Sequence, residues 1–572
     1  MTQKPPLAGL DEFIEQERAQ WKVPGVAIAV VQAGKVILSA GYGQRDIKNA
    51  LLVTPQTVFP LASVTKSLTV ATLAALVRQG RLDWDKPVRE YLPDFRLWDP
   101  VATDRMTARD LVTHRSGLPR HDFAWYGATL SRRELYLRLR YLEPSKDFRS
   151  AYQYQNLMYM TAGYLAGELA GLTWEETVRR TIFKPLGMSR TSTSIPELRR
   201  DADAARPYKK DDAEQVSEVL YYEDAALGPA GSANSCVADL IRYVQMHLGG
   251  GLFRGKVVLS EQDVAQMQTP QMVIPDTSPF PELGHSQYGM GFVVTSYRGH
   301  KLVQHGGALD GFSTLLSFLP QDGLGLVVLS NLSGSSLPSV LMYQVYDRLL
   351  GLAPAPWSAR LQELVSQGKA AEDRAKGQGL TPRKPDTHPS HPISDYPGSY
   401  EHPAYGTVEI KTTEEGLGIG FHGFTSPLHH FHYDVFETPA DKLNNLERRK
   451  VRFETDWSGE IGSLRIAFEP QVADILFTRA ADPALRAPAF LGPLAGDYTL
   501  GGRPLLVRLQ ENGTLQAIFP GQSPYALRPV RETTFDVDGL SGHRIEFQKD
   551  DAGRVTGLAL YQPNGNLLAE RA

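Results

Sequence analysis

Three short motifs, in a fixed order along the chain, constrain this sequence more than any other feature. A Ser-x-x-Lys segment joins Ser63 to Lys66, a Tyr-x-Asn segment joins Tyr154 to Asn156, and a His-Gly-Gly segment begins at His305. Together they supply a hydroxyl nucleophile, two groups able to deprotonate it, and a glycine-rich edge where a carbonyl group could dock. The combination predicts a single cleft built from distant parts of the chain.

Each motif is weak when taken alone. Ser366 and Lys369 also fit Ser-x-x-Lys, and His247 with Gly249 also fits His-x-Gly. Tyr-x-Asn occurs once, although the chain has 24 tyrosines. Context separates the matches, because Ser366 falls in a charged helical stretch and His247 ends an apolar helix before a glycine run. Ser63 instead stands at the N-terminus of a strongly apolar helical stretch.

The composition limits the classes of protein to which the chain could belong. With 572 residues it is too long for one hydrophobic core, so about two to four domains are expected. The net charge of −4 offers no basic field, so neither nucleic acid nor an anionic membrane is an expected partner. The single cysteine, Cys236, permits no intramolecular disulfide and is expected to be a buried, inert thiol.

The N-terminal segment does not resemble a targeting signal. It reads MTQKPPLAGLDEFIEQERAQW and contains no apolar core of the kind found in signal peptides. No run of eighteen apolar residues occurs, so no membrane-spanning helix is expected. A cytoplasmic protein is the expectation that follows.

Hydrophobic periodicity predicts a mixed α/β domain in the first part of the chain. An amphipathic helix is expected at Leu10–Trp21, followed by a hairpin of strands at Val26–Val31 and Val36–Ala40. The helix that Ser63 opens should be buried and should end at Gly80, where positive φ is favoured. Strands at both ends with helices between them indicate an antiparallel sheet. Further helices are expected at Ala108–Thr113, Leu130–Arg140, Asn156–Ala170, Trp174–Thr181 and Ala238–Leu248, and strands at Tyr288–Thr295, Lys301–Gln304, Thr314–Leu319 and Gly325–Leu329.

The composition changes in the last third of the chain. A polar, charged helix is expected at Trp357–Gly379, and five prolines between residues 380 and 397 indicate a stiff linker. From Tyr396 onward, short alternating strands indicate all-β barrels or sandwiches. A faint repeat of Tyr396–Tyr400 in Leu494–Tyr498 indicates two modules, each with room for about eight strands. The expected domains are residues 1–355, a linker at 356–395, and β modules at 396–480 and 490–572.

The first two motifs carry the candidate catalytic groups. Ser63 and Lys66 are three residues apart, so they share one face of a helix. Unpaired N–H groups and the helix dipole in the first turn favour negative charge, which makes the Ser63 N–H a candidate oxyanion donor. Lys66 could be a base through a pKa lowered by burial, or its charge could lower the pKa of Tyr154 and make the phenolate the base. The residues leave both alternatives open.

The remaining motif residues are candidate substrate contacts. Asn156 could orient Lys66 and bond a substrate amide. His305 could position Tyr154 or bind a polar or anionic group of the substrate. Gly307, with the glycine before it, allows close backbone approach, so a substrate could add along this strand edge. The N–H of Ala308 is a candidate second oxyanion donor.

These motifs resemble those of the serine β-lactamase and penicillin-binding-protein superfamily, in its class C-like branch of D-alanyl-D-alanine carboxypeptidases, D-aminopeptidases and esterases. The resemblance covers about residues 8–350. It implies an α/β (α+β) domain with a central antiparallel sheet flanked by helices, and an acyl-enzyme at Ser63 with Lys66 and Tyr154 as catalytic partners. Flanking segments that also look familial are Phe59–Lys66, Leu111–Pro119, Gly228–Gly231 and Tyr288–Gly291.

Two departures from the family motifs, and a second resemblance in the C-terminal part, narrow the expected function and architecture. The third motif has His305 where class C β-lactamases typically have lysine, which disfavours a true β-lactamase. No Gly-x-Ser-x-Gly segment is present, which argues against an α/β-hydrolase. The segment Glu401–Val408 after a Gly-x-Tyr entry is similar to the lipocalin-like β modules appended to some family members. The layout of one catalytic domain with two β-barrels resembles that of bacterial D-aminopeptidases.

The resemblance implies a serine hydrolase acting on D-amino-acid-containing peptides or amides. A carboxylesterase on the same scaffold is the alternative, because its motif residues would be identical. A binder of peptides or β-lactams without turnover belongs to another class and is disfavoured by the complete motifs. The β modules could shape or gate the cleft, or could mediate assembly of a homo-oligomer of two or more copies.

No metal and no cofactor is expected. The run from His429 to His432 holds three histidines, but no cysteine or acidic cluster completes a ligand set, so it is interpreted as an aromatic and polar strand. His114 is interpreted as a scaffold residue. No phosphate-cradling loop or dinucleotide fingerprint occurs.

Overall fold

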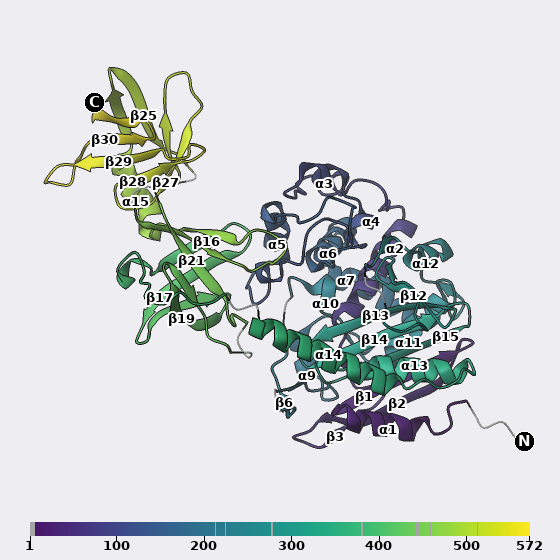
Figure 1. Ribbon diagram of the computed structural model, residues 1–572. Helices are drawn as coiled ribbons and strands as arrows, with labels where there is room; N and C mark the ends of the chain where they lie inside the picture. The colour runs from purple at the N-terminus through teal and green to yellow at the C-terminus, as the bar shows by residue number, and fades with distance from the viewer. Residues whose placement is uncertain are drawn as a thin grey trace, which may run out of the picture. The chain divides into compact units, whose positions relative to one another are not determined.

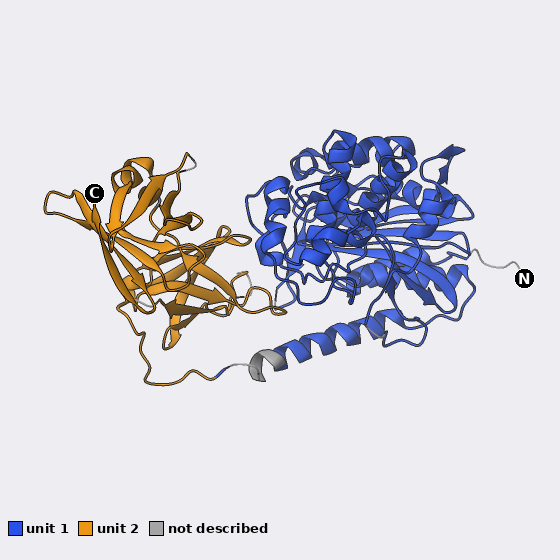
Figure 2. Ribbon diagram, turned by 90° about the horizontal axis from the view of Figure 1, so that it is seen from above, with its two compact units in different colours: residues 1–381 blue, residues 382–572 orange. Residues whose placement is uncertain are grey.

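The computed structural model describes residues 6–572 except 212, 224, 276–277, 379–380, 442–444, 457–458 and 512 (Figure 1). The chain forms two compact units, Met1–Thr381 and Pro382–Ala572 (Figure 2). The charged helix that follows the sheet domain, α14 (Trp357–Gln378), groups with the first unit. Its first residue, Trp357, is buried and packs on Tyr343 with ring centroids 4.3 Å apart. This aromatic contact anchors the start of the helix on the sheet domain.

The first unit is built around a nine-stranded antiparallel sheet, which confirms the predicted fold class. Strand β1 is an inner strand of this sheet and pairs with β15 on one side and β2 on the other. All but the last residue of β1 is buried because helices cover both faces of the sheet. In sheet order the strands are β10 (Met272–Val273), β11 (Gln287–Tyr288), β12 (Val293–Tyr297), β13 (His300–Leu309), β14 (Phe312–Leu319), β15 (Leu324–Ser330), β1 (Gly25–Gln32), β2 (Lys35–Asp46) and β3 (Leu51–Leu52).

Alternate residues of β1 lie on opposite faces of the sheet and pack against two separate helical layers. Val26, Ile28 and Val30 pack into one apolar cluster with residues of α1 and α13, while α11 also packs against β1 and β15. Helices α2, α6 and α10 contact one another in the helical region that holds the motifs. The helices are α1 (Leu10–Gln20), α2 (Thr65–Arg78), α3 (Pro100–Arg105), α4 (Ala108–Leu111), α5 (Arg132–Arg138), α6 (Asn156–Ala170), α7 (Trp174–Val178), α8 (Lys184–Leu186), α9 (Ile195–Arg200), α10 (Gly228–Gly231), α11 (Val237–Leu248), α12 (Glu261–Met267), α13 (Leu337–Leu349) and α14.

Most predicted elements of this unit are confirmed, and one strand is corrected. The predicted helix Asn156–Ala170 coincides with α6, and Gly80 follows α2 with a φ of +69°. The single strand expected at Tyr288–Thr295 is instead two strands, β11 and β12, with Gly291 between them at a φ of +80°. A Cβ on Gly291 would lie 2.9 Å from the Cα of Ser67. The chain therefore bends here to pass close to α2, which an apolar run does not reveal.

The second unit consists of two closed antiparallel barrels of eight strands each, as the resemblance implied. Apolar side chains fill the interior of the second barrel in one continuous cluster. The strands of the first barrel are β16 (Gly398–His402), β17 (Gly406–Thr413), β18 (Gly416–Phe421), β19 (Phe424–His432), β20 (Val435–Glu437), β21 (Lys450–Thr455), β22 (Ile461–Ile466) and β23 (Ile475–Arg479), and those of the second are β24 (Gly496–Leu500), β25 (Arg503–Leu509), β26 (Leu515–Ile518), β27 (Tyr525–Pro529), β28 (Thr534–Val537), β29 (Arg544–Lys549), β30 (Val555–Gln562) and β31 (Gly565–Arg571).

The faint repeat in the sequence forms the same contacts between the first and last strands in both barrels. The Tyr400 hydroxyl donates to the carbonyl of Tyr396, four residues back, at 2.8 Å, and Tyr498 donates to Leu494 at the same distance. An arginine at the end of the last strand lies over each tyrosine ring, Arg479 in the first barrel and Arg571 in the second. Each guanidinium also donates to backbone carbonyls just before the first strand of its barrel. The repeated segment therefore helps to join the first and last strands of each barrel.

A buried histidine in the first unit lacks polar partners. The ring of His247 lies among those of Tyr243, Phe292 and Phe318, with centroids 4.6, 5.2 and 5.4 Å away. Neither ring nitrogen has a hydrogen-bond partner in the described part of the chain. Burial lowers the pKa of His247 to about 3, so below about pH 6.5 the unfolded chain binds a proton that the folded chain does not. This histidine should therefore destabilise the fold, and increasingly so as the pH falls from about 6.5 toward 3.

We expect His247→Phe to raise the free energy of unfolding by about 1 kcal/mol at pH 7.5, because it removes an unpaired buried polar group. The gain should be larger by about 1 kcal/mol at pH 5.5, where the histidine pKa difference also contributes. Urea unfolding of the full chain at the two pH values measures both effects. Replacement of the exposed His285 by alanine is the control. An unchanged or lower stability of His247→Phe at both pH values would contradict the expectation.

Candidate functional site

The nucleophile candidate lies in a short turn that leads into α2. Ser63 belongs to a 3₁₀ turn, Ala62–Val64, and α2 begins only at Thr65. The sequence predicted Ser63 in the first turn of the α-helix, whereas in the structure the serine precedes the helix. The carbonyl of Leu61 accepts a hydrogen bond of 2.9 Å from the hydroxyl of Thr314 on β14. The Leu61 N–H donates to the carbonyl of Ala233 at 2.8 Å. The turn is thus tied to the sheet on one side and to the segment after α10 on the other.

Lys66 is fully buried and has three neighbours that can share hydrogen bonds. Its Nζ lies 3.1 Å from Ser63 Oγ, 2.7 Å from Asn156 Oδ1 and 2.9 Å from the carbonyl oxygen of Ala230. Burial lowers the pKa of Lys66 well below its ordinary value, and the charge of Arg120 lowers it further. Two of the three partners are carbonyl oxygens that can only accept, so two N–H groups of Lys66 are committed to them. The remaining position on Nζ faces the Ser63 hydroxyl.

Tyr154 and Asn156 approach Lys66 from the start of α6. The ring centroid of Tyr154 is 4.8 Å from Lys66 Nζ, and Asn156 is the first residue of the helix. Burial raises the pKa of Tyr154 above its ordinary value, while a hydrogen bond with Ser63 and the charge of Arg120 lower it by smaller amounts. The phenol is therefore neutral near pH 7 and lies against both Ser63 and Lys66.

His114, interpreted from the sequence as a scaffold residue, fixes the position of Tyr154 through its backbone and its ring. Its carbonyl accepts from the N–H of Gln153 at 2.8 Å, and its ring Nδ1 accepts from the N–H of Gln155 at 3.0 Å. The two bonds bracket Tyr154, whose ring contacts the His114 ring with centroids 4.3 Å apart and planes tilted by 32°. Burial lowers the pKa of His114 well below its ordinary value, so the ring is neutral. Because Nδ1 accepts, the hydrogen of the neutral ring is on Nε2.

Arg120 is a site residue that the sequence reasoning missed. Its guanidinium carbon lies 5.5 Å from the centroid of the Tyr154 ring, and its Nε donates to Asp122 at 2.6 Å. Its charge lowers the pKa of Lys66 and of Tyr154. The familial segment Leu111–Pro119 ends directly before Arg120, so its place next to the site was the one available signal.

His305 is held by hydrogen bonds at both ring nitrogens. Nδ1 lies 2.7 Å from the carbonyl oxygen of Gly306, and Nε2 lies 3.1 Å from the hydroxyl of Tyr288. The carbonyl can only accept, so Nδ1 carries the hydrogen and Tyr288 donates to Nε2. Burial, followed by the charge of Lys66, lowers the pKa of His305 to about 4. The ring is therefore neutral near pH 7, which disfavours binding of an anionic group by its charge.

The third motif also presents an open strand edge. Strand β12 pairs with β13 only as far as Gln304, so among the described residues no strand pairs with β13 on that side from His305 onward. The Gly306 carbonyl at this edge accepts from the His305 ring. Backbone groups of alternate residues in a strand point the same way, so the N–H of Ala308 lies at the same edge. Ala308 thus presents a donor beside the turn that carries Ser63, since β13 contacts that turn.

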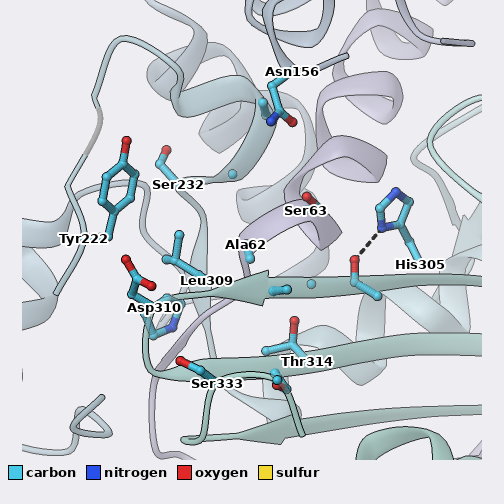
Figure 3. A pocket seen from close by; sticks show the side chains of 18 of the residues that line it. Ala62, Ser63, Asn156, Tyr222, Ser232, His305, Leu309, Asp310, Thr314 and Ser333 are labelled. Atoms are coloured by element: carbon cyan, nitrogen blue, oxygen red, sulfur yellow. Dashed lines mark hydrogen bonds between the residues drawn. The ribbon is translucent and has the colours of Figure 1, made fainter. Parts of the chain in front are cut away.

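The motif residues other than the buried Lys66 line one pocket of about 840 Å³ in the first unit (Figure 3). Figure 3 shows Ser63 below Asn156 and beside His305, with the strand that leads to Leu309 and Asp310 passing below the serine. Asp310 and Tyr222 lie on the opposite side of the pocket from His305. The pocket also includes residues that the sequence did not single out, among them Arg120, Asp122, Tyr126, Lys209, Tyr222 and Asp310.

Neither a metal site nor a membrane helix is found in the described parts of the chain. No cluster of three or more histidine, cysteine, aspartate or glutamate side chains is placed to bind a metal ion there. Within the same residues, each helix is too short or too polar to cross a bilayer.

Comparison with known sequences finds two family models and related hydrolases. The model of the Beta-lactamase family matches residues 10–345, and a model described as a domain of unknown function, DUF3471, matches residues 382–479. The unguisins hydrolase ungD′ of Aspergillus campestris is 32% identical over 71% of this chain and 77% of its own length. The ungD hydrolase of Aspergillus violaceofuscus is 29% identical over 68% of this chain and 74% of its own length.

Comparison with solved structures shows the same fold. The octameric penicillin-binding protein homologue of Pyrococcus abyssi matches 82% of this chain and all of its own, with a TM-score of 0.54 and 23% identity. The D-amino acid amidase of Ochrobactrum anthropi matches 61% of this chain and 98% of its own, with a TM-score of 0.50 and 23% identity. The family match covers more than half of the chain, so this protein belongs to the Beta-lactamase family of serine hydrolases.

Proposed function

We propose that this enzyme hydrolyses peptides or amides that contain D-amino acids, through an acyl-enzyme at Ser63. The observation that carries the proposal is the set of contacts around Lys66 Nζ, which has two carbonyl acceptors and the Ser63 hydroxyl as its partners. A neutral amine fits this set, because its two N–H groups go to the carbonyl oxygens and its lone pair faces Ser63 Oγ. The lowered pKa of Lys66 supports the neutral form.

Under this proposal Lys66, rather than Tyr154, is the resting base. The Ser63 oxygen attacks the scissile carbonyl carbon while its proton passes to Lys66 Nζ. The N–H groups of Ser63 and Ala308 stabilise the resulting oxyanion. The proton then reaches the leaving amine, either from Lys66 or through the neutral Tyr154 hydroxyl. Water attacks the acyl-enzyme by the reverse transfers, and Ser63 regains its proton.

The substrate class rests on the relatives and on the open edge of β13. Among the related proteins, one is a D-amino acid amidase, and two are named for hydrolysis of unguisins. A strand edge that continues past the nucleophile suits an extended peptide, which can bond along it by its backbone. A carboxylesterase would use the same residues, so substrate comparison has to separate the two.

We expect D-alanine p-nitroanilide to be hydrolysed at least tenfold faster than the L-enantiomer, measured as kcat/KM. The panel also includes p-nitrophenyl butyrate and nitrocefin, with Ser63→Ala as the background for every substrate. Turnover of the ester alone, dependent on Ser63, would reassign the protein to the carboxylesterases. Nitrocefin as the best substrate would make it a β-lactamase. Equal rates for both anilide enantiomers would contradict the D-selective proposal.

A further inference from the structure

The wall of the pocket beyond Ala308 carries two charged side chains that do not form an ion pair. Asp310 stands at the tip of the β13–β14 hairpin and Lys209 on β5 (Tyr208–Lys210), and both are exposed in the pocket. No ion pair within the described residues includes either of them, whereas Asp122 is paired with Arg120. The pocket therefore offers one carboxylate, that of Asp310, without a cationic partner.

The hairpin tip that carries Asp310 is held rigidly. Gly311 has a φ of +88°, and a Cβ there would lie 2.0 Å from Cβ of Pro207. The Gly311 N–H donates to Ser333 Oγ at 2.6 Å, and its carbonyl accepts from the Tyr208 N–H at 3.4 Å. The tip is thus clamped between two neighbouring segments, so the position of Asp310 is set before a ligand arrives.

Aromatic rings adjoin the Asp310 carboxylate. The Tyr126 hydroxyl donates to Asp310 Oδ2 at 3.1 Å. The Tyr126 ring stacks on that of Tyr222, with centroids 4.8 Å apart and planes 6° from parallel. Figure 3 shows Tyr222 and Asp310 on the same side of the pocket. A carboxylate oriented by a hydroxyl beside aromatic faces is a suitable environment for an ammonium group, through charge and cation–π attraction.

The distance along the strand matches the reach of a short acyl chain. Asp310 is two residues beyond Ala308, which corresponds to roughly 6–7 Å along an extended strand. The amino group of an acyl residue lies closer than that to its own carbonyl, and at about that distance from the carbonyl one residue further on. A substrate whose carbonyl meets the Ala308 N–H can therefore place such an amino group near Asp310.

We propose that Asp310, with the Tyr126–Tyr222 pair, binds a free, protonated amino group on the acyl part of the substrate. The group belongs to the residue that supplies the scissile carbonyl or to the residue before it. This inference rests on the proposed acyl-enzyme at Ser63 and adds that the enzyme acts on peptides or amides with an unblocked amino end. Lys209, on the neighbouring strand β5, has the opposite charge to Asp310 and would repel an ammonium group.

A pair of phosphonate probes tests the inference without knowledge of the natural substrate. Diphenyl 1-aminoethylphosphonate and its N-acetyl derivative can each phosphonylate Ser63, as the serine oxygen displaces phenol from phosphorus. The rate constant of adduct formation is followed by intact-protein mass. We expect the free amine to react at least tenfold faster than the acetylated probe in the wild type, and less than threefold faster in Asp310→Asn. The acetylated probe should react equally with both proteins.

Two controls, the pH dependence of the reaction and a variant of Lys209, distinguish binding of the amino group by Asp310 from a purely structural role of that residue. The advantage of the free amine should shrink as the pH rises through the pKa of the probe's amino group and the probe loses its proton. Lys209→Gln, which removes the opposite charge from the same wall, should keep or increase the advantage. Equal rates of the two probes in the wild type would overturn the inference, and so would an advantage that survives in Asp310→Asn. Failure of both probes to modify Ser63 would instead contradict the acyl-enzyme proposal.

Discussion

Replacing Lys66 with methionine is expected to lower kcat/KM by about 10³- to 10⁴-fold, toward the upper end of the loss for a positioned base. The reason is the single free position on Lys66 Nζ, which faces Ser63 Oγ at 3.1 Å while the other two partners can only accept. Methionine has a similar length and no proton acceptor of comparable strength. Steady-state kinetics on the best substrate of the panel, with the melting temperature as a check on folding, measure the effect.

Tyr154→Phe is the matched contrast for this variant. Tyr154 has a raised pKa and is a neutral phenol at rest, so its loss should slow proton delivery without removing the base. We expect a smaller decrease, of about 10- to 100-fold, spread over acylation and deacylation. A larger loss in Tyr154→Phe than in Lys66→Met would reverse the assignment and make the tyrosine the principal base.

The pH profile supplies a second readout of Lys66. The amine accepts a proton only in its neutral form, and burial lowers the pKa of Lys66 well below its ordinary value. Activity should therefore fall on the acid side of the profile as Lys66 becomes protonated, and rise as the pH increases. The residual activity of Lys66→Met should lack that acid limb. An unchanged acid limb in the variant would mean that another group titrates there.

Gly307→Ala is expected to lower kcat/KM by about 10²- to 10³-fold, the loss typical of one oxyanion donor. A Cβ on Gly307 would lie 2.2 Å from the Leu61 carbonyl oxygen and 2.2 Å from Thr314 Oγ1. These two atoms form the hydrogen bond that ties the nucleophile turn to the sheet. The added methyl group must separate β13 from that turn and so move the Ala308 N–H away from Ser63.

The neighbouring glycine provides the control for this prediction. A Cβ on Gly306 would meet only the carbonyl oxygen of Thr314, at 3.8 Å, which is ordinary contact. Gly306→Ala should therefore stay within about threefold of the wild type. Similar losses in the two variants would show that the close contact at Gly307 is not the cause. The two proteins should be compared for kcat/KM and for melting temperature.

Local patterns predicted the elements that depend on short-range physics. Helix α6 follows from its apolar spacing, and the turn after α2 follows from Gly80, because both are set by neighbouring residues. The repeat at Tyr400 and Tyr498 predicted two β modules, since each tyrosine bonds a carbonyl only four residues away. The strand expected at Tyr288–Thr295 was wrong because its break depends on the approach of α2, which is distant in the sequence.

The candidate site divides in the same way. The three motifs predicted the residues that meet around Ser63, although their roles remain proposals. The third partner of Lys66, the carbonyl of Ala230, could not be predicted, because every residue has a carbonyl and only packing selects one. His114 and Asp310 belong to no catalytic motif, and their positions follow from contacts with Tyr154 and Tyr126.

The sequence by itself determined which chemical groups this protein has and in what order they follow, because residue type and helical or strand spacing are local properties. The tertiary structure alone decided their protonation and alignment. Lys66 has a lowered pKa because surrounding segments bury it, and Ala308 faces an open edge because the pairing of β12 with β13 stops at Gln304. Both depend on desolvation and on contacts between distant segments, which no local pattern encodes.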